Sequence, residues 1–185
     1  MSPTSSTATT STARLEQLLP QLFQPDTQTG DRYLKIDIAP NLPALIALED
    51  VQESAWMPAH MVTPIPNLPA CVLGIMNARN QVLCVVNLAQ LLQISGSTVH
   101  RQHYSMLTVR LPPTLAAPED TNLLVLAVQE IQGILRLQPK DIESPIGDFG
   151  ATLTPFLRGC VEREGQSIPV LDVKAIAAAP PLTSR

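Results

Sequence analysis

Two histidines and three cysteines are the most obvious candidates for metal binding or nucleophilic chemistry. His100 and His103 are separated by two residues in a polar connection, with no cysteine or further histidine close enough in sequence to complete a metal shell. This spacing is typical of a solvated loop. The cysteines lie in apolar segments, with no adjacent cation or helix start to stabilise a thiolate. We therefore interpret them as buried thiols: Cys71, Cys84 and Cys160.

Motifs that mark enzymes are missing from the sequence. It has no glycine-rich phosphate loop, Walker motif, GxSxG elbow or HExxH helix, and its eight glycines are scattered. Acidic residues such as Asp50, Glu53, Glu119, Asp120 and Glu130 are numerous, but the sequence alone brings no two of them together. A cysteine-based or metal-assisted hydrolase has only isolated residues in its favour. We expect that the protein is not an enzyme and that it binds no metal and no cofactor.

A single arginine stands out in an otherwise aliphatic stretch from Thr63 to Leu88. A proline-rich segment leads into an apolar strand, a tight turn carries Arg79, and a second apolar strand follows. An unpaired charge near a core is costly, so Arg79 favours a carboxylate partner, for which Glu53 is a candidate. The alternative is an exposed arginine without a partner.

Short apolar runs bounded by Pro, Gly, Asn and Asp fill the chain from Arg32 onward, and this pattern predicts strands and turns. Only Leu88–Leu92 and Val173–Ala178 are predicted as helical turns within this body. Many short strands separated by turns favour small barrels. The predicted strands are Tyr33–Ile38, Leu45–Leu48, Val51–Trp56, Cys71–Met76, Val82–Val86, Ser105–Val109, Leu123–Val128, Gly133–Leu137, Arg158–Arg163 and Ser167–Leu171.

The sequence also repeats itself. Residues 72–88 align with residues 157–173 at a constant offset of 85, which pairs Gly74 with Gly159 and two hairpin corners, Asn80-Gln81 and Gly165-Gln166. The same offset pairs Asn87 with Asp172, both good N-caps for a following helix. A second repeat matches Val51-Gln52-Glu53 with Val128-Gln129-Glu130. These repeats predict two similar β-subdomains, about residues 32–92 and 105–178, sharing one core.

The ends of the chain differ from this body. Residues 1–12 are rich in Ser and Thr and are expected to form a floppy tail, and residues 181–185 a short C-terminal tail. Within the N-terminal region 1–31, the arm Ala13–Phe23 places leucines at helical spacing but contains Pro20. It either packs on the body or docks a partner.

Charge and hydropathy narrow the class of partner. The net charge is -4 and the 12 Lys and Arg residues form no run, so nucleic acid is an improbable partner. No stretch approaches the roughly 18 apolar residues that span a bilayer. We expect a cytoplasmic protein that does not insert into the membrane.

The stretch around Arg79 resembles the signature of CheW-like domains, P-N-x-P-x-x-x-x-G-x-x-N-x-R-G-x-x-x-P-x-x-D-L. The likeness covers about residues 32–178, within an expected CheW-like domain of residues 32–180, and Val51-Gln52-Glu53 resembles the family's V-x-E. The chain departs from the family where Asn80 replaces Gly, Cys84 replaces Pro, Asn87 replaces Asp and Gln129 replaces an acidic residue. The matching residues are Pro66, Asn67, Pro69, Gly74, Asn77, Arg79 and Leu88.

This resemblance implies an all-β fold of two packed five-stranded SH3-like barrels with short helices and no catalytic group. It implies an adaptor for chemotaxis or phototaxis, recruited to membrane-associated receptor arrays. The implied partners are the regulatory domain of a CheA-type histidine kinase and the cytoplasmic tip of a chemoreceptor-like protein. The resemblance places Glu53 and Arg79 beside the partner-binding surface, where we also expect Val51, Ile75, Met76, Asn77 and Asn80.

In this interpretation aliphatic patches supply affinity, and the region of Glu53 and Arg79 supplies polar specificity. The alternative is a β-domain that senses a small molecule in the cleft between its two barrels, because apolar clefts between domains commonly hold ligands.

Overall fold

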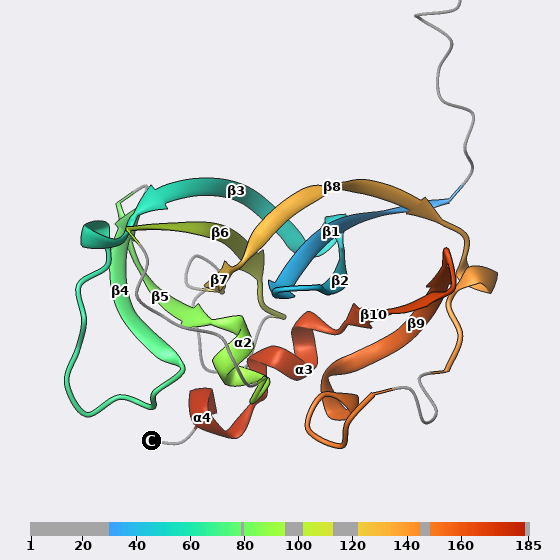
Figure 1. Cartoon of the computed structure of the whole chain (residues 1–185). Helices are drawn as coiled ribbons and strands as arrows, with labels where there is room; N and C mark the ends of the chain where they lie inside the picture. Colours follow the sequence, from blue (N-terminus) through green and yellow to red (C-terminus); the bar gives the residue numbers. More distant parts are fainter. Residues whose placement is uncertain (1–29, 79, 95–101, 113–121, 145–148, 184–185) are drawn as a thin grey trace, which may run out of the picture.

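The chain folds into two five-stranded sheets, as the computed structural model in Figure 1 shows. The structure describes residues 30–78, 80–94, 102–112, 122–144 and 149–183, so the expected N-terminal tail and the arm Ala13–Phe23 lie outside it. All ten predicted strands are confirmed. Their bounds are β1 Asp31–Ala39, β2 Leu42–Ala47, β3 Val51–Pro58, β4 Val72–Ala78, β5 Gln81–Asn87, β6 His103–Arg110, β7 Leu123–Val128, β8 Glu130–Leu137, β9 Leu157–Arg163 and β10 Gln166–Leu171.

Short helices connect these strands, and both predicted helical turns are present. None of the helices in the described part of the chain is long and apolar enough to cross a membrane. Leu182, where a C-terminal tail was expected, packs against the core from α4. The helices are η1 Leu48–Asp50, η2 Ala59–Met61, α2 Leu88–Leu91, η4 Pro139–Asp141, η5 Thr154–Phe156, α3 Val173–Ala177 and α4 Pro180–Thr183.

The two sheets exchange strands between the two sequence halves. The first sheet has the order β8-β1-β2-β10-β9, and the second has β3-β6-β7-β5-β4. Adding five to each strand number of the first order, and counting β11–β15 as β1–β5, gives the second order. The segments β1–β5 and β6–β10 are therefore equivalent halves. The expectation that segments 32–92 and 105–178 each form their own subdomain is wrong, because each sheet combines two strands of one half with three of the other.

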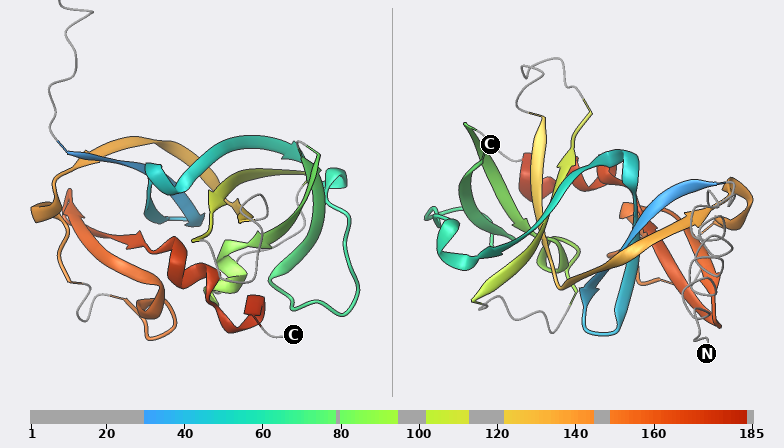
Figure 2. Two further views of the ribbon diagram at one scale, coloured as in Figure 1. Left: turned by 180° about the vertical axis from the view of Figure 1, so that it is seen from behind. Right: turned by 90° about the horizontal axis from the view of Figure 1, so that it is seen from above.

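The second sequence repeat marks the places where the chain changes sheet. After β2 the chain leaves the first sheet through η1 and enters β3 of the second at Val51. After β7 it returns, and β8 of the first sheet begins at Glu130. Gln129 between them donates its backbone N–H to the carbonyl of Asp37 at 2.9 Å. Figure 2 shows the two sheets side by side with these crossings between them.

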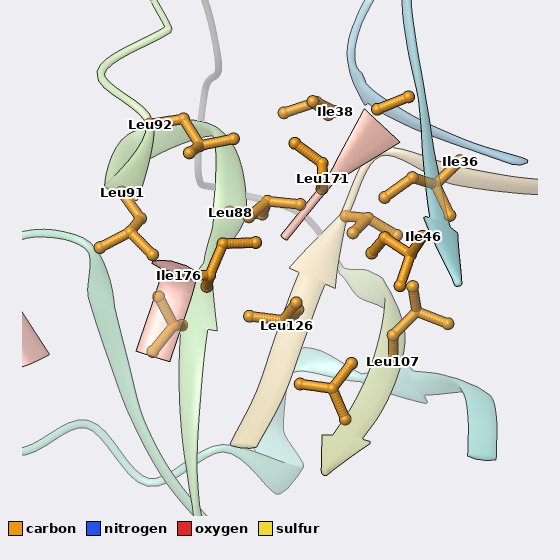
Figure 3. Packing of buried hydrophobic residues seen from close by; sticks show 14 of the residues in the cluster. Ile36, Ile38, Ile46, Leu88, Leu91, Leu92, Leu107, Leu126, Leu171 and Ile176 are labelled. Carbon is orange, nitrogen blue, oxygen red and sulfur yellow. The ribbon is translucent and has the colours of Figure 1, made fainter. Parts of the chain in front are cut away.

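Strands near the middle of the molecule are buried on both faces, which explains their nearly continuous apolar sequences. In β7, Leu124, Leu126 and Val128 contact a cluster shared by both sheets, whereas Val125 and Ala127 point into the second barrel. The shared cluster also takes side chains from α2 and α3. Figure 3 shows its centre, including Ile36, Ile38, Ile46, Leu88, Leu107, Leu126, Leu171 and Ile176.

Each barrel has its own smaller interior cluster. That of the first sheet contains Tyr33, Leu45, Ala47, Leu137, Val161, Ile168 and Val170. That of the second contains Val62, Met76, Leu83, Val85, Met106, Val125 and Ala127. The body therefore has three clusters in a row, with the shared one in the middle.

The paired glycines of the repeat close the two barrels in the same way. Thr63 and Ile75 exchange backbone hydrogen bonds of 2.8 and 2.9 Å, and Glu143 and Cys160 do so at the same two lengths. Gly74 precedes Ile75, and a Cβ on it would collide with the Thr63 carbonyl. Gly159 precedes Cys160, and a Cβ there would lie 2.7 Å from the Glu143 carbonyl oxygen. A glycine is needed at each closure because the two backbones approach this closely.

The predicted corners and caps of the repeat are confirmed. Asn80 and Gly165 have φ angles of 67° and 74°, the left-handed conformation that Asn and Gly tolerate best. The Asn87 side chain accepts a hydrogen bond from the backbone N–H of Gln90 at 3.0 Å. Asp172 accepts from Lys174 at 2.8 Å. Asn87 thus caps α2 although it replaces the family's aspartate.

Candidate partner-binding surface

The β4–β5 hairpin carries most of the candidate residues. Its register pairs Ile75 with Cys84 and Asn77 with Val82, so these four side chains share the outer face of the second sheet. Ile75 is half-buried and Asn77 is exposed. Val82, which the sequence interpretation did not single out, is 66% exposed. This outer face combines apolar and amide groups that a partner can reach.

Met76 does not belong to this surface. Its side chain points into the second barrel, where it is 6% exposed and packs in the same cluster as Leu83 and Val85. The expectation that Met76 lies at the partner-binding surface is therefore wrong. Alternation along a strand places neighbours on opposite faces, so Ile75 and Met76 could not both have faced a partner.

β3 supplies Val51 and Glu53. Val51 is half-buried, pairs with Val109 and packs against the shared cluster. Glu53 is half-buried and lies opposite Thr108, just after an irregularity in the β3–β6 register. The irregularity shifts the alternation between these two residues, so Val51 packs against the shared cluster, whereas Glu53 is on the same strand face as Met57, which packs against the interior cluster of the second barrel.

Arg79 lies outside the described residues, and its expected proximity to Glu53 stays a prediction. Its neighbours in sequence are described. Ala78 pairs with Gln81 at the end of the hairpin, and Asn80 is exposed at the corner. The candidate surface is defined here as Glu53, Ile75, Asn77, Asn80 and Val82, with Arg79 expected among them from its place in the sequence, and it combines two segments of the second sheet. Val51 packs against the shared cluster and is not part of this surface.

An exposed aromatic pair on the same sheet was missed by the sequence interpretation. Trp56 of β3 is 69% exposed, and its ring stacks on that of His103 in β6 with centroids 3.9 Å apart and planes 6° apart. His103 had been interpreted as part of a solvated loop. The β3–β6 register brings these two rings together across 47 positions of sequence, and no local pattern could reveal that pairing.

The described residues offer little for chemistry. Burial raises the pKa of Cys71 and of Cys84, which keeps both thiols protonated and unreactive. Within the described part of the chain, no three His, Cys, Asp or Glu side chains gather in a way that could hold a metal ion. The arrangement is suited to binding another surface.

Comparisons with known proteins agree with this geometry. A family model described as the CheW-like domain matches residues 33–180. A chemotaxis protein CheW of Rhizobium meliloti is 26% identical over 133 residues, covering 71% of this chain and 76% of that protein. The crystal structure of the scaffolding protein TtCheW from Thermoanaerobacter tengcongensis superimposes with a TM-score of 0.67 at 17% identity, covering 83% of this chain and 96% of that one.

Proposed function

The chain belongs to the CheW-like domain family, and from this premise we propose that it is a non-catalytic adaptor in a chemotaxis-type signalling pathway. It couples a chemoreceptor-like protein to a CheA-type histidine kinase by binding the receptor's cytoplasmic tip and the kinase's regulatory domain. The observation that carries the proposal is the family match over residues 33–180, which spans nearly all of both sheets. We further propose that the protein acts in the cytoplasm, at membrane-associated receptor arrays.

The mechanism is binding at the candidate surface. Ile75 and Val82 provide apolar area on the hairpin, and Asn77 provides an exposed amide beside them. Glu53 and Arg79 supply the charges that select a partner. Interfaces of this kind need not be strong singly, because an array repeats each contact many times.

The small-molecule alternative finds less support. It places a ligand between the two barrels, where the shared cluster fills the space with buried side chains such as Ile46, Leu107 and Leu126.

The direct test is to titrate the purified chain with a kinase regulatory domain and with a receptor-tip fragment, together with the variant Arg79→Ala. An arginine at the centre of an interface contributes ~2 kcal/mol or more, so we expect its removal to weaken binding by about 30-fold. The cost to folding should be only about 0–1 kcal/mol if Arg79 forms a surface pair with Glu53. Arg79→Glu should bind more weakly still, through repulsion from Glu53.

Arg163→Ala is the matched control, because Arg163 is exposed at the corresponding end of β9 in the other sheet. It should bind both partners like the unmodified chain. If the unmodified chain binds neither partner, the proposed function is wrong. If it binds both and a folded Arg79→Ala variant binds equally well, only the role of Arg79 is lost.

A further inference from the structure

Two arginines face each other on the first sheet. The β1–β8 register places Arg32 directly opposite Arg136. Opposed residues of antiparallel strands project from the same face with Cβ atoms roughly 5 Å apart, and like charges at this spacing destabilise a sheet. Arg136 is half-buried and Arg32 is exposed. The fold thus maintains two neighbouring positive charges at a cost.

A hollow of about 270 Å³ lies beside this pair. Its wall includes both arginines and Tyr33, and also two carboxylates, those of Asp31 and Glu49. None of these four charged side chains forms an ion pair with another residue in the part of the chain that the structure describes. Within the described residues, no carboxylate of the chain is ion-paired with either guanidinium group, so both can take a carboxylate from a partner.

An apolar side chain extends the arginine pair along β8. Ile134 is two residues from Arg136, so it lies on the same face, and it is 56% exposed. Arginine is enriched at protein interfaces, and Ile134 adds exposed apolar area beside it. We call Arg32, Arg136 and Ile134 the arginine face.

We propose that the arginine face is a second docking surface, which binds a carboxylate-bearing segment of a protein partner. The inference rests on the proposed function, since an adaptor must hold two partners at once. The candidate surface lies on the second sheet and the arginine face on the first, so the two can be occupied together. The paired guanidinium groups accept a carboxylate through parallel charge-assisted hydrogen bonds, and Ile134 contacts apolar groups beside it.

The two carboxylates in the same hollow favour a protein side chain over free phosphate as the anion that binds there. With Asp31 and Glu49 present, the four charged groups sum to zero, so the hollow does not concentrate a multiply charged ion such as free phosphate. A singly charged side chain, delivered by a surface that also covers Ile134, is the better fit. Its binding should weaken as salt increases, because the arginine face is solvent-accessible.

The test uses the full chain carrying Arg32→Gln and Arg136→Gln together, with Arg163→Gln of the same sheet as control. Both kinase regulatory domain and receptor-tip fragment are titrated at low and high salt. We expect the double variant to lose about tenfold or more in affinity for one partner at low salt, with a flatter salt dependence, and to keep the other. Its melting temperature should be unchanged or higher, because the repulsion between the arginines is gone.

Several outcomes would overturn the inference. If a folded double variant binds both partners within about twofold of the unmodified chain, the arginine face is not a docking surface, and the proposed function is unaffected. A lower melting temperature with unchanged affinities assigns the arginines to folding. If inorganic phosphate stabilises the unmodified chain but not the double variant, and partner binding is unaltered, the hollow is a small-anion site. If the unmodified chain binds neither partner, both proposals fail.

Discussion

Met76 and Asn77 are neighbours in sequence with opposite surroundings, and substitution should separate stability from binding. Met76→Ala removes a side chain that is 6% exposed from the second barrel, at an expected cost of about 2–5 kcal/mol. Asn77→Ala changes an exposed side chain and should alter stability by no more than about 0.5 kcal/mol. Urea unfolding of both variants measures the difference.

The same two variants should behave in the opposite order in binding. Asn77→Ala is expected to weaken the affinity for at least one partner, whereas Met76→Ala, at a temperature where it is folded, should bind normally. A Met76→Ala variant as stable as the unmodified chain would contradict the burial of this side chain.

Asp50, at the end of η1, gives stability a dependence on pH. Burial raises the pKa of its carboxyl group, and the nearby carboxylates of Glu49 and Asp172 raise it further. The folded state therefore holds this proton more tightly than the unfolded state does. The stability from the protonated form is complete below the unfolded pKa and is lost as the pH rises through the folded pKa.

Asp50→Asn removes this ionisation. We expect the variant to melt at a higher temperature than the unmodified chain at pH 7, and the difference to shrink as the pH falls toward 4 and below. Thermal melts across this pH range provide the measurement. Glu162→Gln is the control, because Glu162 is exposed on β9 and should show no such advantage. An Asp50→Asn variant that is less stable at pH 7 would mean that the carboxylate makes a favourable interaction.

At the scale of elements, the glycines that close the barrels are expected to tolerate no side chain. Gly74 has a φ of 146° and backs onto the Thr63 carbonyl and Pro64 Cα, the latter 2.9 Å from a built Cβ. Gly74→Ala therefore combines strain with a backbone collision, and we expect a loss of about 3 kcal/mol or more. Differential scanning calorimetry of the variant tests this.

Gly133→Ala is the matched control for this prediction, since Gly133 also lies in a strand but nothing lies within 4 Å of its built Cβ. Its stability should be equal or slightly higher, because alanine restricts the unfolded chain. Similar melting temperatures for Gly74→Ala and Gly133→Ala would show that the closure yields more easily than its geometry indicates.

The elements themselves were predictable because their signals are local. Apolar runs ended by turn residues predicted every strand among the described residues, and the offset of 85 predicted both hairpin corners and both caps. Strand order was not predictable in this way, since pairing β1 with β8 depends on contacts about 100 positions apart. The faces of Ile75 and Met76 could not be assigned because both are apolar and the register shifts between Val72 and Gly74. The pairing of Trp56 with His103 is likewise a long-range contact.

At the scale of the molecule, the shared cluster should make the two sheets unfold together. It joins residues of both, and Leu126 at its centre is fully buried. Trp56, the single tryptophan of the chain, lies in the second sheet, so its fluorescence reports on that sheet, whereas far-ultraviolet circular dichroism reports on both. We expect the two signals to give the same midpoint in denaturant.

Leu126→Ala is expected to lower that common midpoint by an amount equivalent to about 2–5 kcal/mol without separating the two signals. Ser54→Ala, an exposed change on β3, serves as control. A fluorescence transition that precedes the dichroism transition would show that the second sheet opens independently and that the cluster does not couple the two.

The exchange of strands between sequence halves has a consequence for a divided chain. A cut between Ile94 and Gln102 would leave five strands on each fragment, but each sheet needs strands from both fragments. Neither fragment can complete a barrel, and each would expose the apolar side chains that the shared cluster buries. The intact chain is thus equivalent to two complementary pieces tethered together, and the tether holds each half close to the half that completes it.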